Sequence, residues 1–480
     1  MSSLESYHVK IRRMIVLMVV VFIATAAQAQ NLRTSYFMES APYRLNLNPA
    51  MAPDRGFVLI PIVGNLNGSV HSDALGVDDV VDLLKNGDDD DYYITDDFFN
   101  KLKDRNKACV VSGTDLISVG WWRGESFLSL NIGVKADGYV CVPRELFSFM
   151  RDMKGLNSND YSDYLREMGE AEMNLNAYTE IGFGYTRQIN DRVSVGGRLK
   201  GLLGHGNLHV KVNHVTVKTN LEGVDPNLNW ATVDPVELLC AEGTASIDAD
   251  AFMESSVQGL DLFTNDDGYI DHAHFDTKNM GVAGLGAAVD VGVSCRLSDE
   301  FALSAAVTDL GFIRWSKSNT RVAHANTSDL TYNSEDPKNA EHFLGIVGSG
   351  DAINLHLLRL VPEDRPVSRT TTLTSTLVVG GEYMPMKDVL RLGALYTSHF
   401  AECGNENELT FSLNYHPKSL LDFSLSYSPI MCGGSSFGLA MKLGPLFVGS
   451  DYLFLGNRSK CCNALVGLSI PLSSRGDKGR

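Results

Sequence analysis

Apolar and polar residues alternate along four runs near the end of the chain, 409–415, 421–428, 437–443 and 464–470. In the first run, one set of alternate positions carries Leu409, Phe411, Leu413 and Tyr415, and the other carries Thr410, Ser412 and Asn414. Successive side chains of a β-strand point to opposite faces. This period of two therefore predicts strands with one apolar and one polar face.

The same alternation recurs through the rest of the chain, where longer inserts interrupt it. Further candidate strands cover residues 56–70, 114–122, 127–136, 178–189, 192–203, 205–219, 282–297, 301–315, 372–384 and 389–400. Together the runs number about 14 to 16, and single-chain bacterial barrels have even strand counts. We therefore predict about 14 barrel strands, with one or two runs in extended hairpins above the membrane.

Two settings produce strands with one apolar face, a soluble sandwich and a membrane barrel. The outer faces of a sandwich usually carry many Lys and Glu, whereas a membrane barrel turns its apolar faces to lipid. Here the polar faces are mostly Ser, Thr, Gly and Asn, and the runs have the length of tilted membrane strands. Lipid cannot satisfy an open sheet edge. We therefore predict an all-β fold, a closed antiparallel transmembrane β-barrel over residues 56–472, with a secreted β protein as the alternative.

The N-terminus has the three parts of a secretory signal peptide. Basic residues precede an apolar run over 14–27, and small residues stand at both recognition positions of Ala27-Gln28-Ala29. The apolar run is shorter than the ~20 residues that a spanning helix needs. Residues 1–29 are therefore expected to be a cleaved signal peptide, and the mature protein is expected in the cell outer membrane.

Acidic residues concentrate in the inserts. The formal net charge of −17 opposes binding to nucleic acid. Residues 71–100 hold ten acids and one lysine, and residues 221–280 hold thirteen acids and one lysine. Because the long loops of membrane barrels lie outside the cell, we predict acidic extracellular loops at 71–112, 221–280 and 316–369. These loops are either solvated acidic surfaces, or they bind divalent cations that bridge them to the anionic headgroups of outer-membrane lipid and lipopolysaccharide.

Helical spacing appears within two of the inserts. Pro143 suits the first position of a helix, and Gly155 would stop it. One face of this loop helix would carry Leu146, Phe149, Met150 and Met153. Residues 161–168 suggest a second short helical turn, and residues 339–360 suggest another helix. The first helix either caps the pore mouth, lines the entry of a hydrophobic ligand or packs as part of an ordinary loop.

Patterns for catalysis or metal binding are weak. The chain has no G-x-S-x-G, no H-E-x-x-H and no phosphate-binding glycine loop in a suitable context. Eight cysteines without regular spacing read mostly as small apolar residues, with one disulfide possible. Around Gly268 a calcium-loop pattern lacks its two most demanding ligands, and His272 and His274 lack an evident third ligand. We predict no catalytic residues, no metal site and no cofactor.

A resemblance to known barrels lies just after the signal. The segment Leu45-Asn46-Leu47-Asn48-Pro49-Ala50-Met51-Ala52-Pro53 resembles the hatch of the long-chain fatty-acid transporter (FadL-like) barrels, and it is similar to the PorV and PorQ barrels of type IX secretion. With Asp54-Arg55-Gly56, Ile60-Pro61-Ile62, Tyr178-Thr179-Glu180 and residues 195–200, the chain resembles more closely an uncharacterised family of such barrels. The resemblance implies a 14-stranded barrel whose N-terminal segment, residues 30–55, plugs the lumen.

The resemblance also implies a ligand path along the plug, at Asn48, Pro49, Ala50 and Met51. Asn48 can satisfy polar groups of the lumen, Pro49 fixes a bend and Ala50 permits close approach. An ordinary capped loop is the alternative. The chain departs from the resembled barrels at its end, where a polar tail over 473–480 replaces a terminal aromatic residue.

Three functions fit these observations. The first is passive transport or binding of hydrophobic or amphipathic small molecules, which requires a lateral gap or an apolar lumen pocket. The second is a partner barrel for a secretion system or a surface protein. The third is a structural outer-membrane protein without transport. We favour transport, and we expect that the protein is not an enzyme.

Overall fold

The computed structural model describes residues 32–474 apart from 77–78, 80–94, 154–162, 223–241, 336–357, 364, 366, 387–388, 402–403, 419–420, 432–433 and 454–459. The predicted signal peptide and most of the helix predicted over 339–360 lie outside these residues.

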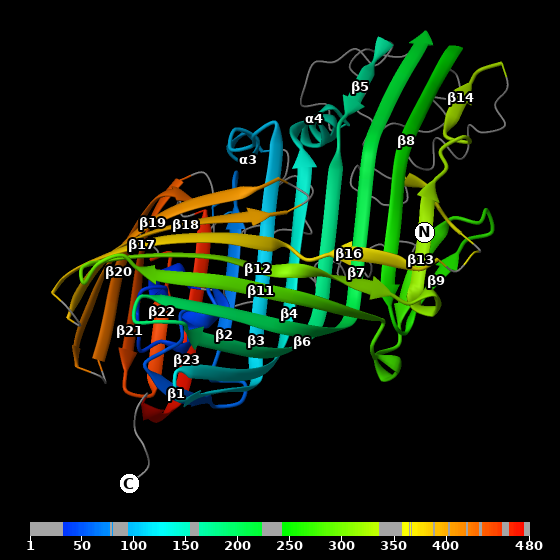
Figure 1. Ribbon diagram of the computed structural model, residues 1–480. Helices are drawn as coiled ribbons and strands as arrows, with labels where there is room; N and C mark the ends of the chain where they lie inside the picture. Colours follow the sequence, from blue (N-terminus) through cyan, green and yellow to red (C-terminus); the bar gives the residue numbers. More distant parts are fainter. Residues whose placement is uncertain are drawn as a thin grey trace.

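Fourteen strands form a closed antiparallel barrel, and two of them are interrupted. In order around the barrel these are β1 (Arg55–Leu59) with β2 (Leu66–Ser72), β3 (Arg105–Arg123), β4 (Ser126–Pro143), β6 (Ala171–Gln188), β7 (Val193–Glu222), β11 (Gly284–Arg296), β12 (Phe301–Trp315), β16 (Arg369–Thr372) with β17 (Ser375–Met386), β18 (Leu390–Phe400), β19 (Glu406–Lys418), β20 (Leu421–Met431), β21 (Gly434–Leu443), β22 (Leu446–Ser450) and β23 (Cys461–Ser474). Both β1 and β2 pair with β23, which closes the barrel (Figure 1). The predicted all-β barrel of 14 strands is confirmed.

The barrel turns its apolar side chains outward. On β20, Leu425 and Tyr427 are 49% and 41% exposed, whereas Ser424 and Ser426 are buried. The same exposed apolar face recurs around the barrel at Phe183, Leu199, Leu285, Leu303, Val379, Leu392, Phe411, Leu439 and Val466. An apolar exterior around a polar interior is the surface chemistry of a barrel that spans a lipid bilayer.

The two ends of the barrel differ. At one end, tight turns join the strands, and the glycines at two of them, Gly124 and Gly444, have φ of +62° and +58°, a conformation that side chains disfavour. At the long-loop end, the sheet continues past the barrel through β5 (Leu165–Met168), β8 (Glu242–Val257), β13 (Thr320–Ala325), β14 (Thr331–Asn333) and β15 (Leu360–Pro362). Figure 1 shows β5, β8 and β14 rising beyond the barrel.

This extension corrects the predicted loops. Strand β3 begins inside the segment predicted as the loop 71–112, β8 and the hairpin of β9 (Leu260–Thr264) and β10 (Ile270–Phe275) lie within 221–280, and β13 to β15 lie within 316–369. Buried Ala249, Ala251 and Met253 of β8 pack against Val210 and Ala323. Small alternating residues thus hold a second, smaller core outside the barrel, and the acidic residues between them face away from it.

Two short α-helices lie at the long-loop end, α3 (Asp96–Phe99) and α4 (Arg144–Met153). The helix predicted after Pro143 is confirmed as α4. The second helical turn predicted over 161–168 is wrong for residues 165–168, which form β5 and pair with β7 from Leu165 opposite Lys218 onward, whereas residues 161–162 lie outside the described residues. Long-range pairing with β7 outweighs the local helical spacing. Short 3-10 turns also occur at η5 (Thr277–Asn279) and η6 (Lys317–Asn319).

None of the helices in the described part of the chain is long and apolar enough to cross a membrane. The cysteines are mixed in state: Cys141 is disulfide-bonded, whereas Cys109, Cys295 and Cys462 are free thiols.

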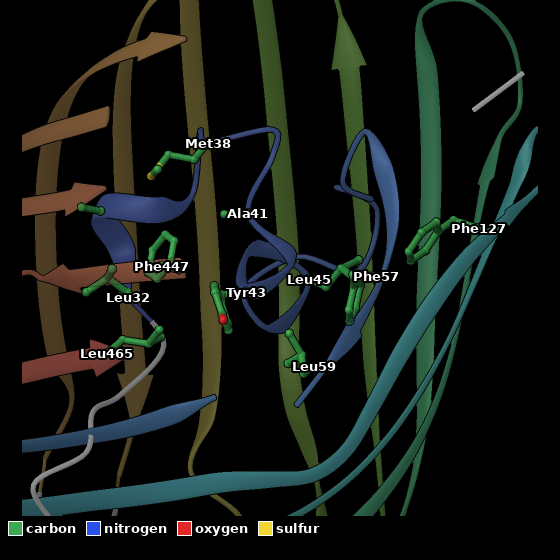
Figure 2. Packing of buried hydrophobic residues seen from close by; sticks show 11 residues of the cluster. Leu32, Met38, Ala41, Tyr43, Leu45, Phe57, Leu59, Phe127, Phe447 and Leu465 are labelled. Atoms are coloured by element: carbon green, nitrogen blue, oxygen red, sulfur yellow. The ribbon is translucent and has the colours of Figure 1, made fainter. Parts of the chain in front are cut away.

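The N-terminal segment lies inside the barrel. We call residues 32–54 the plug; it contains the 3-10 helices η1 (Arg33–Ser35) and η2 (Pro42–Asn46). Its apolar side chains pack on the barrel wall in a cluster of Leu32, Met38, Ala41, Tyr43 and Leu45 with Phe57, Leu59, Phe127, Ala440, Phe447 and Leu465. Figure 2 shows Leu32 beside Phe447 and Leu465 of the wall, and Tyr43 between these residues and Phe57.

Candidate functional site

Asn48 is the central anchor of the plug, and its side chain is fully buried. Its Nδ2 donates to the Tyr36 hydroxyl at 3.0 Å and to the carbonyl oxygens of Val293 and Ala305 at 3.4 Å. Its Oδ1 accepts from the Ala50 backbone N–H at 2.9 Å. One amide therefore connects two parts of the plug to the neighbouring strands β11 and β12.

The next three residues contact two further strands. The Thr186 hydroxyl on β6 donates to the Pro49 carbonyl at 2.5 Å, and the Ser194 hydroxyl on β7 donates to the Ala50 carbonyl at 3.0 Å. Met51 is buried in an apolar cluster with aromatic residues of the plug. The four residues singled out from the sequence, 48–51, thus lie together against β6, β7, β11 and β12.

Inward-facing glycines make room for the plug. A side-chain carbon built on Gly196 would lie 2.2 Å from the Pro49 carbonyl oxygen, and one on Gly292 would lie 2.1 Å from Asn48 Oδ1. Plug atoms approach seven strands in this way, at Gly196, Gly292, Gly380, Gly393, Gly438, Gly449 and Gly467. Any larger residue there would have to displace the plug or the wall.

Arg33 fixes the opposite end of the plug. Its guanidinium lies 2.7 Å from the Glu408 carboxylate of β19 and donates to the Tyr452 hydroxyl at 2.6 Å. The Asp451 carboxylate accepts from the backbone N–H groups of Arg33 and Thr34 at 3.0 and 2.8 Å. Both members of the Arg33–Glu408 ion pair are buried. Such a pair is expensive to break, because the remaining charge stays buried.

We expect Asn48→Ala to lower the free energy of unfolding by about 1 to 3 kcal/mol, because the substitution leaves its hydrogen-bond partners, Tyr36 among them, short of a bond in a buried site. Urea unfolding of the detergent-solubilised protein measures the change. The matched control is Asn190→Ala, since Asn190 is exposed in a tight turn and bonds only backbone N–H groups there. An equal loss in both variants would contradict the anchoring role.

A third contact places charge at the middle of the plug. Arg391 of β18 lies 2.6 Å from Glu39 of the plug and 3.2 Å from Glu382 of β17. Desolvation in the lumen alone would raise the pKa of Glu39, but the Arg391 guanidinium holds it below its ordinary value. Glu39 is therefore a carboxylate that pairs with the wall.

The wall beside the plug carries a balanced cluster of charges. Lys200 Nζ lies 2.8 Å from Asp290 and 2.7 Å from Asp309. Lys135 Nζ lies 2.7 Å from Glu180. All five side chains project from wall strands, and the three acids offset the two lysines and the nearby guanidinium that contacts Asp290 at 4.0 Å. The lumen at this level is thus strongly polar without a large net charge.

A small pocket of about 20 Å³ lies between the plug and the wall. Its lining combines the apolar residues Pro42, Tyr43, Leu45, Phe57 and Leu59 with the polar residues Asn46, Asp115, Ser118, Ser129, Asn131 and Arg198. Figure 2 shows Tyr43, Leu45, Phe57 and Leu59 where the plug meets the wall. The Arg198 guanidinium donates to Asn46 Oδ1 at 3.0 Å. The pocket is amphipathic.

The barrel wall is irregular beside this pocket. The run 56–70 was expected as one strand, but it is split into β1 and β2. Leu59 pairs with Ser469 and Leu66 with Val466, so seven steps along the first strand match three along β23. The four extra residues form a bulge within the segment 60–65, which we call the wall bulge. A second register shift, at Asp115 in β3, lies next to it.

The wall bulge presents apolar side chains to the outside. Ile62 and Val63 are 56% and 42% exposed. Ile62 has φ of +68°, which is unfavourable for a β-branched residue. Its N–H donates to the Asp115 carbonyl at 3.0 Å, and the Tyr43 hydroxyl of the plug donates to the Gly64 carbonyl at 2.6 Å. The bulge is thus joined to both the pocket and the plug.

The loop helix belongs to a different region. Helix α4 contains all four residues of its expected face; Phe149 is buried, whereas Leu146 is half-buried. The Phe147 ring packs on Phe98 of α3 with ring centroids 5.4 Å apart, and Arg151 lies 2.8 Å from Asp96. The helix packs on α3, β4 and β5 at the long-loop end. The structure does not bring this helix together with residues 48–51.

Several residues of the site were missed from the sequence. Arg33 and Glu408 lie on strands and segments separated by most of the chain, and no local spacing could join them. The pocket residues likewise come from separate strands. One usable signal was present: glycines stand at the inward positions of several predicted strands, where alternation predicts polar side chains.

Comparisons with known proteins give one family and several solved barrels. The model described as "Family of unknown function (DUF5723)" matches residues 49–451. The search of curated proteins finds no match. The toluene transporter TodX of P. putida aligns over 90% of this chain and 94% of its own, at 10% identity and a TM-score of 0.38. A FadL homologue of Pseudomonas aeruginosa aligns over 93% of this chain and 95% of its own, at 8% identity and a TM-score of 0.37. The toluene transporter TbuX of Ralstonia pickettii aligns over 90% of this chain and 94% of its own, at 11% identity and a TM-score of 0.28.

Proposed function

We propose that this chain, which belongs to the family of unknown function DUF5723, is an outer-membrane barrel that binds amphipathic small molecules in its plugged lumen and lets them pass. The observation that carries the proposal is the amphipathic pocket beside an interruption of the barrel wall. A strand break in a lipid-facing wall is costly where the backbone loses partners. Its placement next to a cavity is what a lateral opening requires.

The wall bulge supplies a route between lipid and lumen. Ile62 and Val63 lie on the outside, and Leu59 and Asp115 line the pocket on the inside. Asp115 connects the pocket to the wall bulge. Its carbonyl accepts from Ile62 N–H, and its carboxylate accepts from Asn65 Nδ2 at 2.8 Å. A ligand in the outer leaflet of the bilayer therefore has only a short thickness of protein to cross.

The chemistry of the pocket selects a class of ligand. Among its lining residues, Leu45, Phe57 and Leu59 suit an apolar body, and Asn131 and Arg198 suit a polar or anionic head. The cavity of about 20 Å³ is much smaller than a ligand pocket, so a ligand enters only when side chains of the plug move aside. Once the plug moves, this lining suits a small amphipathic molecule or one end of a longer one.

The plug controls the onward path. Its Tyr43 lines the pocket and also bonds the wall bulge at Gly64. A ligand that displaces Tyr43 would loosen the plug and the bulge together. Transport is then passive, because it needs only exchange between two arrangements of contacts already present in the fold.

We expect Ser118→Leu to weaken binding of a fluorescent fatty acid at least about tenfold, because a leucine side chain fills the pocket and a tenfold loss corresponds to only about 1.4 kcal/mol. Fluorescence titration of the purified protein in detergent measures the affinity. Uptake into proteoliposomes should fall in parallel.

The matched control is Ser112→Leu, since Ser112 lies on the same strand but outside the pocket lining. Binding and uptake should stay within about twofold of the parent. Parent protein that neither binds nor takes up the probe would overturn the proposal. Equal losses in the two variants would also contradict it, because they would point to general damage to β3.

A second function, a docking barrel for a secreted or surface protein, is favoured by one observation. The sheet extension beyond the barrel carries the acidic residues Asp248, Asp250 and Glu254 on β8, and the first two are exposed. Chemical crosslinking in intact cells, followed by purification of the barrel, tests this function. A partner crosslinked at β8 but absent after substitution of both exposed aspartates by asparagine would support it.

A further inference from the structure

Three potential metal ligands meet at the long-loop end of the lumen. His71 lies near the end of β2, Cys109 near the start of β3 and Glu406 at the start of β19. Strand β19 pairs with β18 and β20, so it is not a neighbour of β2 or β3 in the sheet. The cluster therefore joins two separate parts of the barrel wall above the Arg33 end of the plug.

The spacing of the ligand atoms suits a small tetrahedral metal ion. His71 Nε2 lies 3.0 Å from Glu406 Oε1, and Cys109 Sγ lies 3.6 Å from the same oxygen. All three ligand atoms lie within 4.8 Å of one another. Zinc bonds of about 2.0 to 2.3 Å place the ligand atoms of a tetrahedron about 3.3 to 3.7 Å apart. An ion at the centre would need only small shifts of the side chains.

We propose that His71, Cys109 and Glu406 form a zinc site. Imidazole nitrogen, thiolate sulfur and carboxylate oxygen are the three kinds of ligand that zinc takes in proteins. A neutral imidazole, a thiolate and a carboxylate would together neutralise the two positive charges of the ion. That balance matters because His71 and Cys109 are buried.

Lys107 is the competing cation. Its Nζ lies 2.8 Å from Glu406 Oε1 and donates to the Gly404 carbonyl at 3.2 Å. A zinc ion on Glu406 would displace the ammonium group, which keeps the Gly404 carbonyl as a partner. With three protein ligands, the fourth position is left for water or another donor. We therefore expect reversible binding, and Lys107→Ala should strengthen it.

The site also has a consequence for the plug. Glu408 follows Glu406 by two residues on β19, so the two side chains point to the same face of the strand, and Glu408 holds Arg33. An ion on Glu406 would tie β19 to β2 and β3 directly above that anchor. Metal binding would then stabilise the Arg33 end of the plug against the wall. This effect does not depend on whether the pocket binds an amphipathic ligand.

Cobalt(II) is the probe for the experiment, because a cobalt–thiolate bond gives a charge-transfer absorption that other ligands do not. Full-length protein, purified in detergent and freed of metal with a chelator, is titrated with cobalt and then with zinc. We expect saturation at one ion per chain, displacement by zinc, and complete loss of the charge-transfer band in Cys109→Ser. His71→Ala and Glu406→Gln should each weaken binding about 10- to 100-fold or more.

Two matched controls separate this site from other thiols and imidazoles. Cys462→Ser removes an exposed free thiol, and His272→Ala removes an exposed imidazole of the β9–β10 hairpin; both should bind cobalt like the parent. Each variant is first checked for the migration difference between boiled and unboiled samples that folded barrels show. A parent protein without the band, or a band that persists in Cys109→Ser, would overturn the proposal. As a second readout, excess zinc should slow the reaction of Cys109 with a thiol reagent, and an unchanged rate would count against the site.

Discussion

Arg33→Met is expected to lower the free energy of unfolding by about 3 to 5 kcal/mol, the largest stability effect that we predict for a single substitution. Methionine fills a similar volume, so little packing is lost. The cost arises because the Glu408 carboxylate, which lies 2.7 Å from Arg33, stays buried after its cation is removed. Urea unfolding in lipid vesicles, followed by tryptophan fluorescence and gel migration, measures the change.

Two further variants separate charge from packing. Arg33→Met combined with Glu408→Gln should recover part of the loss, since a neutral amide is cheaper to bury than a lone carboxylate. Arg105→Met removes a guanidinium that lies 3.8 Å from Glu170, and both side chains are about half exposed; this change should cost less than about 1 kcal/mol. If Arg33→Met and Arg105→Met cost the same, the buried ion pair does not hold the plug.

The barrel could be predicted from the sequence because its signal is local. Alternation at Leu409, Phe411 and Leu413 marks a strand, and the bilayer then requires closure. The same logic identified α4 from helical spacing after Pro143. It failed for residues 165–168, whose apolar spacing is helical but whose backbone pairs with β7. It also failed on β8. There the apolar positions are the small residues Ala249 and Ala251, and the acidic residues between them led to the prediction of a loop.

The candidate site was only partly predictable. Residues 48–51 were singled out by resemblance, and Asn48 does satisfy polar groups of the lumen. The wall bulge was not foreseen, because Ile60-Pro61-Ile62 is apolar and continues the strand pattern. Its signals were Pro61, which cannot donate to a sheet ladder, and Gly64 close behind it.

Contacts across the lumen cannot be predicted from local sequence patterns. Glu406 lies 335 and 297 residues along the chain from His71 and Cys109, and its strand β19 is adjacent to neither β2 nor β3 in the sheet. Arg33 and Glu408 meet in the same way. Each pair depends on the way the wall strands close around the plug, which alternation does not encode. The charge balance of these clusters becomes visible only after the wall strands are placed.

Gly196→Val is expected to release the plug, and this is the largest functional effect that we predict. A side-chain carbon at residue 196 would overlap the Pro49 carbonyl oxygen at 2.2 Å, and the neighbouring backbone of Ala50 lies 2.6 Å away. Neither group can rotate away, because Asn48 and Thr186 hold this turn from both sides. We expect ion conductance in planar bilayers to rise at least about tenfold, since overpacking by about 1 to 3 kcal/mol is enough to shift the plug equilibrium that far.

The adjacent glycine supplies the control. Gly197 points to the other face of β7, where a side-chain carbon would meet only the Asp290 carbonyl at 3.5 Å, an ordinary contact. Gly197→Val should therefore keep the parent conductance. Deletion of residues 31–53 should reach at least the conductance of Gly196→Val while losing fatty-acid binding, because Tyr43 and Leu45 of the pocket leave with the plug. If Gly196→Val and Gly197→Val conduct alike, the plug does not seal the lumen. If the deletion still binds the fatty acid at full affinity, the pocket between plug and wall is not where the ligand sits, since three of its five apolar lining residues would then be gone.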